Sequence, residues 1–189
     1  MKSTYLWFGA QIALVVVAVC IGALSQDQDC AVSFSGVINA YSPQSSTTGP
    51  YEVRGPWSLK LNKDSGKANF SAALNMELSD GWALTLGHGN FDPAARGAHT
   101  HHISLVDAEV VWLQTGGFEV NGTMTRMATI TLNGSPAPVS PSPLVIDITG
   151  GTSVKYSNIT LTFGVPGSNH FGTEPLSGVV RRVSKELQR

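Results

Sequence analysis

Cysteine is scarce in this sequence, since only Cys20 and Cys30 occur among its 189 residues. Small exported domains that depend on disulfides carry several cysteines. Cys20 lies in an apolar N-terminal run, so Cys30 has no internal partner once that run is removed. We therefore expect the hydrophobic core to stabilise the fold. We interpret Cys30 as a small structural side chain, with intermolecular pairing as the alternative.

Charged side chains are also few, and neither sign dominates. Asp, Glu, Lys and Arg make up 13% of the residues, with 12 basic and 13 acidic side chains and a net charge of −1. The composition therefore excludes a polycation that binds nucleic acid and an acidic interaction tail.

The common catalytic motifs are missing as well. The sequence contains no G-x-S-x-G nucleophile elbow, no H-E-x-x-H helix, no P-loop and no G-x-G-x-x-G turn. Hydrolysis by any of those designs is therefore not expected, and no catalytic residue is assigned.

The N-terminal region has the layout of a secretory signal peptide. An apolar run over residues 6–24 follows Lys2, and the small residues Ala23 and Ser25 occupy the third-last and last positions before a predicted cleavage site. We therefore predict that residues 1–25 are a signal peptide.

The remaining residues, 26–189, have a suitable length for a single domain. We expect this domain to be secreted, periplasmic or held at the cell surface. An uncleaved N-terminal anchor is the alternative, because the apolar run reaches the roughly 18 residues at which a membrane-spanning helix becomes feasible. That anchor would be the only contact with a membrane.

Alternation of apolar and polar residues dominates the chain after Ala31. In the segment 68–78 apolar residues recur at every second position, as in a strand with one buried face. A second alternation covers the segment 118–132 and inverts at Arg126 and Met127, where we expect a bulge or a strand break.

Further strands are predicted in six segments, which are residues 32–40, 57–62, 103–113, 144–149, 154–163 and 176–183. Glycine-rich turns between them indicate antiparallel pairing. About eight or nine strands in one exported domain predict an all-β fold, either an antiparallel β-sandwich or a jelly-roll-like barrel. Residues 42–51 and 134–143 are expected to be loops, and a helical period is suggested only for the short tail, residues 183–189.

Four of the five histidines fall within fifteen residues, as His88, His99, His101 and His102. On a strand, His99 and His101 share one face and lie about 6.6 Å apart along it. They have the parity of the apolar residues that follow them, whereas His102 points to the opposite face. Two neighbouring imidazoles on the apolar side can share one metal ion.

Neutral imidazoles are typical ligands of zinc and copper(II). We predict a transition-metal site formed by His99 and His101, with His88 as the third ligand and Asp92, Glu77 or water completing the shell. Sulfur from a methionine would instead favour copper(I), and the candidates are Met76, Met124 and Met127.

The alternative is that these histidines are ordinary polar residues, because an H-x-H triplet often arises by chance. His170 lies in an expected loop, residues 167–172. It would join the same site if that loop covers the same end of the sheet.

The histidine run is preceded by three glycine-containing stretches, which are Phe34-Ser35-Gly36, Gly55-Pro56-Trp57-Ser58-Leu59 and Gly66-Lys67-Ala68-Asn69-Phe70. Their order resembles the layout of CHRD domains, the extracellular β-modules named after chordin. The resemblance covers residues 32–105. It implies a non-enzymatic extracellular module with His99 and His101 at the matching positions and no inherited catalytic residue.

The sequence therefore predicts an exported, non-enzymatic binding protein with an unidentified ligand or extracellular partner and a candidate zinc or copper site. A secreted adhesion or carbohydrate-binding module is one alternative, in which Trp57, Trp82 and Trp112 form a sugar-stacking surface. A metal-dependent enzyme of unknown substrate is another, and it requires an open coordination position with a nearby acid or base.

Overall fold

The computed structural model describes seven segments of the chain, which are residues 30–42, 50–79, 98–124, 126–131, 136–137, 141–150 and 156–187. The predicted signal peptide or anchor, residues 1–25, lies outside them. Within these segments, no helix is long and apolar enough to cross a membrane.

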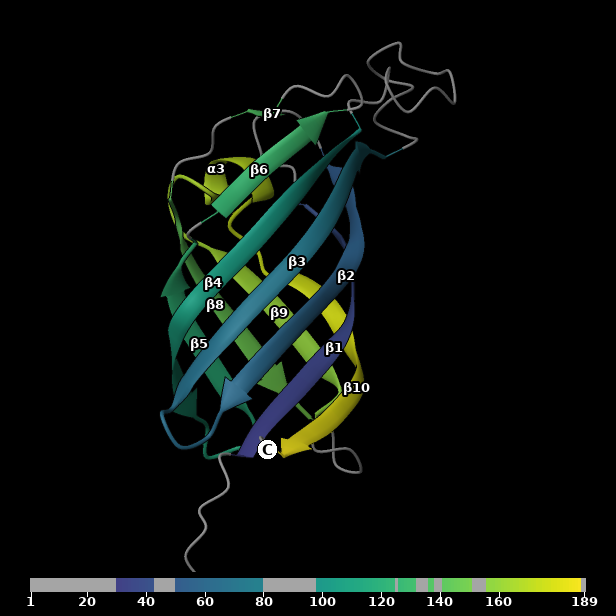
Figure 1. Cartoon of the computed structure of the whole chain (residues 1–189). Coiled ribbons are helices and arrows are strands. Elements are labelled where there is room, and N and C mark those ends of the chain that lie inside the picture. Colours follow the sequence, from purple (N-terminus) through teal and green to yellow (C-terminus); the bar gives the residue numbers. More distant parts are fainter. Residues whose placement is uncertain are drawn as a thin grey trace, which may run out of the picture.

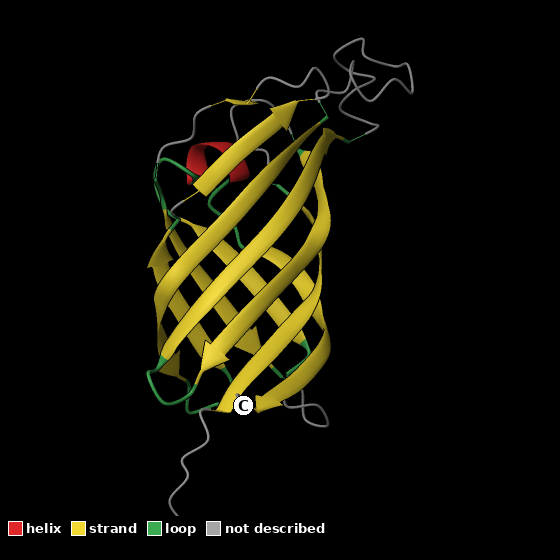
Figure 2. Ribbon diagram, in the orientation of Figure 1, coloured by secondary structure: helices red, strands yellow, loops and turns green. Residues whose placement is uncertain are grey.

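The described residues are almost entirely antiparallel β-structure (Figure 2). The strands are β1 (Cys30–Tyr41), β2 (Tyr51–Asn62), β3 (Lys67–Leu78), β4 (His99–Trp112), β5 (Phe118–Thr123), β6 (Arg126–Thr131), β7 (Pro136–Ala137), β8 (Pro143–Thr149), β9 (Asn158–Phe163) and β10 (Leu176–Leu187). One helical turn, α3 (Ser168–Phe171), precedes β10. The predicted all-β fold is confirmed, and several strands are longer than predicted.

Eight of the described strands close into a barrel (Figure 1). Around the ring the order is β1, β2, β3, β4, β5, β8, β9 and β10, and β10 pairs with β1. Neighbours in the ring are also neighbours along the chain, except that β6 and β7 come between β5 and β8 and that the first strand, β1, closes the ring with the last, β10. The architecture is therefore an up-and-down barrel, without the Greek-key connections of a jelly roll.

Strand β4 has two successive partners on one of its sides. Its residues 109–112 pair with β5, and its residues 99–104 pair with β6. Because β5 ends at Thr123 and β6 begins at Arg126, the predicted break beside Arg126 is confirmed. Beyond the break, β6 lies near the end of the barrel that holds α3 (Figure 1).

The C-terminal tail corrects one prediction. Residues 183–187 are not helical, because β10 continues to Leu187 and pairs with β1 as far as Cys30. The pairing satisfies the backbone groups of both strands and closes the ring. This tertiary gain outweighs the weak helical period of a short segment.

Inward-facing residues alternate with exposed ones along the strands and fill the barrel. In β3 the alternation predicted from the sequence is confirmed, with Phe70, Leu74 and Met76 at most 2% exposed. The turn α3 adds Phe171, which is 0% exposed and stacks on Phe163 with the ring centroids 4.1 Å apart. This aromatic pair anchors α3 to the barrel.

Strand β1 approaches β10 very closely at Gly36. A Cβ atom at this position would lie 1.8 Å from the carbonyl oxygen of Val179 and 3.0 Å from the ring of Trp57. The register between the two strands also shifts between Ser35 and Gly36. The backbone therefore leaves no room for a side chain.

We expect Gly36→Ala to lower the free energy of unfolding by about 2 kcal/mol or more, because backbone must move to admit the methyl group. Urea unfolding measures the change. Gly66→Asn is the control, since Gly66 has a φ of 62° and nothing within 4 Å of an added Cβ, and asparagine tolerates this conformation. A change below about 0.5 kcal/mol is expected there, and equal losses in both variants would contradict the packing argument.

Candidate metal centre

Strand β4 carries two of its histidines into the barrel. His101 is 2% exposed and His99 is partly buried, whereas His102, which follows them, is exposed. Ile103 and Leu105 continue the buried parity. The predicted orientation of His99 and His101 toward the apolar side is therefore confirmed.

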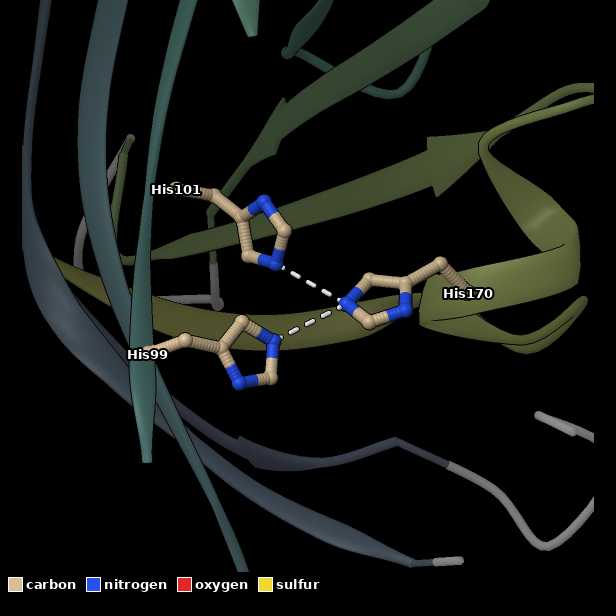
Figure 3. Close-up of side chains that lie close together, drawn as sticks. All are labelled: His99, His101 and His170. Carbon is tan, nitrogen blue, oxygen red and sulfur yellow. Dashed lines mark hydrogen bonds between the residues drawn. The ribbon is translucent and has the colours of Figure 1, made fainter. Parts of the chain in front are cut away.

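A third imidazole reaches the same point from a distant part of the chain. The Nε2 atom of His170 lies 3.1 Å from Nε2 of His99 and 2.8 Å from Nε2 of His101 (Figure 3). His170 belongs to α3, and the burial of Phe171 holds this turn beside the first residues of β4. The ring of Phe171 also contacts the ring of His101, with the centroids 4.9 Å apart.

His99, His101 and His170, here called the histidine trio, lie close enough together to hold one metal ion. One potential ligand atom from each lies within 4.8 Å of the other two. Metal–nitrogen bonds of about 2.0–2.1 Å in a tetrahedral zinc site place two ligand nitrogens about 3.3–3.4 Å apart. The observed Nε2 separations of 2.8 and 3.1 Å are close to that value.

Hydrogen bonding alone accounts poorly for this arrangement. The Nε2 atom of a neutral imidazole has either one N–H or one lone pair. Nε2 of His170 therefore cannot form two strong hydrogen bonds, although two other Nε2 atoms lie within hydrogen-bonding distance of it. A cation at the centre would satisfy all three lone pairs together.

Burial keeps the imidazoles of His101 and His170 neutral. It lowers the pKa of His101 from 6.5 to about 3, with repulsion from His170, His99 and His102 adding to the effect. Burial, followed by repulsion from His99, lowers the pKa of His170 from 6.5 to about 4. Both side chains are therefore neutral near pH 7, which is the protonation state that binds a metal ion.

Aromatic and apolar side chains surround the histidine trio. The ring of Tyr51 packs edge-on against His99, with the centroids 5.5 Å apart. On β3, Met76 lies opposite His99 and Leu74 lies opposite His101. Within the described segments, no carboxylate or thiol belongs to this group of ligand atoms.

The structure changes the ligand set expected from the sequence. Glu77 alternates with the buried Met76 and Leu78 on β3, so it faces away from the barrel interior and is not a ligand. His88 and Asp92 lie outside the described residues, and the role of His88 as third ligand stays a prediction. In the described segments the third imidazole of the group is that of His170.

His170 was foreseen only as a conditional ligand in a loop. No sequence spacing links His170 to the H-x-H triplet, because 68 residues lie between it and His101. The one available signal was the aromatic Phe171 beside it, which anchors the turn by burial. That signal does not indicate which end of the barrel the turn covers.

The predicted sugar-stacking surface is not formed as expected. Trp57 is 3% exposed and packs on Phe70 inside the barrel, with the ring centroids 6.4 Å apart. Trp112 is half-exposed and contacts Phe118. Trp82 lies outside the described residues. Trp57 therefore cannot share a solvent-facing surface with Trp112.

Comparison with protein-family models, with curated proteins and with solved structures finds no match. The resemblance to CHRD domains therefore stays a prediction. The functional interpretation of the histidine trio depends on its geometry and chemistry.

The depressed pKa values predict that the metal-free protein is less stable in acid. Because the pKa values of His101 and His170 are lower in the folded state, the unfolded chain binds more protons between pH 6.5 and about 4. Stability is therefore fully present above pH 6.5 and falls as the pH decreases through this range. The expected slope is up to about 1.4 kcal/mol per pH unit for each of the two histidines.

Urea unfolding of chelator-treated protein at a series of pH values measures this slope. The matched control is the double variant His101→Gln and His170→Gln, which removes both titrating groups. Its stability should depend much less on pH in the same range. A slope equal to that of the unsubstituted protein would show that other groups cause the acid sensitivity.

Proposed function

We propose that this protein is an exported β-barrel that binds one transition-metal ion, zinc or copper, through His99, His101 and His170. The observation that carries the proposal is the convergence of three Nε2 atoms at separations that hydrogen bonding cannot fully satisfy. Imidazole nitrogens suit both metals. The neutral state of His101 and His170 removes the need to displace protons near pH 7.

Export is supported by the apolar run over residues 6–24 and by the small residues Ala23 and Ser25 before the predicted cleavage site. The extracellular role implied by the resemblance to CHRD domains is consistent with this route. A secreted, periplasmic or surface-held protein would take up its metal ion outside the cytoplasm.

Binding is favoured over catalysis by the surroundings of the histidine trio. A metal-dependent enzyme needs an acid or base beside an open coordination position. Among the described residues the ligand group includes no carboxylate, and the contacting rings of Tyr51 and Phe171 are largely buried. The proposed activity is therefore to hold a metal ion rather than to turn over a substrate.

The test is metal binding by the protein purified without an added histidine tag. We expect about one zinc or copper ion per chain by elemental mass spectrometry. Each of the variants His99→Ala, His101→Ala and His170→Ala should weaken the affinity by at least about a hundredfold, since even changes outside the ligand shell cost ten- to hundredfold. Competition with a chromophoric chelator gives the dissociation constants.

His102→Ala is the matched control, because His102 lies on the same strand but is exposed on the opposite face. Its affinity should stay within about twofold of the unsubstituted protein. Circular dichroism of every variant checks that the barrel is intact. Equal losses in all four variants, or no uptake of added zinc or copper by the unsubstituted protein, would overturn the proposal.

A further inference from the structure

We propose that the thioether of Met76 is a fourth ligand and that the centre prefers copper(I) to zinc. This inference depends on the proposed metal binding by the histidine trio. It adds to that proposal the identity of the ion and a ligand that lies on a different strand.

Met76 occupies the position from which an additional ligand can reach the site. In the β3–β4 pair it lies directly opposite His99, and it is 0% exposed on the same inward face. Side chains directly opposite each other on one face of an antiparallel pair have Cβ atoms about 4.5–5.5 Å apart. The unbranched methionine side chain has three rotatable bonds, so its sulfur can adjust to an ion between the imidazoles.

The chemical softness of the ligand atoms distinguishes copper(I) from zinc. Zinc sites in proteins use thiolate, imidazole and carboxylate ligands. Thioether sulfur is a soft ligand that favours copper(I). Three imidazoles with one thioether therefore suit copper(I), whereas a zinc ion would use the imidazoles alone.

Charge balance favours the same ion. Imidazole and thioether are neutral ligands, and no carboxylate of the described segments joins the ligand group. The Born cost of moving an ion from water into a low-dielectric interior grows with the square of its charge, so a divalent ion costs about four times as much as a monovalent one. A copper(I) ion therefore needs less compensation at this position than zinc(II).

The test compares copper(I) and zinc affinities in Met76→Leu and Met124→Leu variants of the full-length protein. Leucine keeps most of the buried volume and removes the sulfur. Met124 is another buried methionine, at 1% exposure, and it follows β5 without a paired residue on β4, so Met124→Leu tests whether the sulfur ligand belongs to Met76 in particular. Copper(I) affinity is measured anaerobically with a reductant and bicinchoninate as competitor, and zinc affinity with a chromophoric zinc chelator.

We expect Met76→Leu to weaken copper(I) binding by at least about tenfold, because even substitutions outside the ligand shell of a metal site typically lower the affinity by about ten- to hundredfold. Zinc affinity should change less than twofold, and Met124→Leu should leave both affinities unchanged. X-ray absorption spectroscopy of the copper(I)-loaded, unsubstituted protein should detect one sulfur ligand. This measurement needs no variant, so the inference stays testable if Met76→Leu does not fold.

The inference is overturned if Met76→Leu leaves copper(I) affinity unchanged, if copper and zinc affinities fall equally, or if no sulfur ligand is detected. In each of these cases, loss of binding in the three histidine variants would still support the proposed metal site. If the unsubstituted protein binds neither ion, the proposed function fails and this inference fails with it.

Discussion

The pairing of β1 with β10 joins the first and last described strands of the barrel, from Cys30 opposite Leu187 to Ile38 opposite Gly178. Because this pairing closes the ring, the inward face of every strand becomes interior surface and no open edge of the eight-strand ring needs to be covered. Strands β1 and β10 can approach each other closely at Gly36, because glycine has no side chain. The interior created in this way is the apolar environment in which the histidines lie.

The histidine trio departs from the pattern of the surrounding core. Most inward positions carry aliphatic or aromatic side chains, whereas three imidazoles meet near the end covered by α3 (Figure 3). Two short contacts converge on Nε2 of His170, and one proton or one lone pair cannot serve both equally well. Local conflicts of this kind concentrate at functional sites. A bound cation would turn the conflict into a favourable interaction, which links the stability of this end of the barrel to its proposed function.

Much of the fold follows from residue patterning. The alternation in β3 predicted its buried face, and the inversion at Arg126 predicted the separation of β5 from β6. The choice between a sandwich and a barrel could not be made in this way, because both architectures bury one face of each strand. The strand character of the tail was missed because its partner, β1, lies at the other end of the chain.

The sequence alone determined which faces of β4 its histidines occupy, since the period of two that buries Ile103 and Leu105 also directs His99 and His101 inward and His102 outward. Only the tertiary structure decided that His170 completes the group. Its position depends on the closed barrel, on the stacking of Phe171 against Phe163, and on the end of the barrel at which α3 lies. Local periodicity acts over neighbouring residues, whereas the meeting of two distant segments depends on how the whole chain packs.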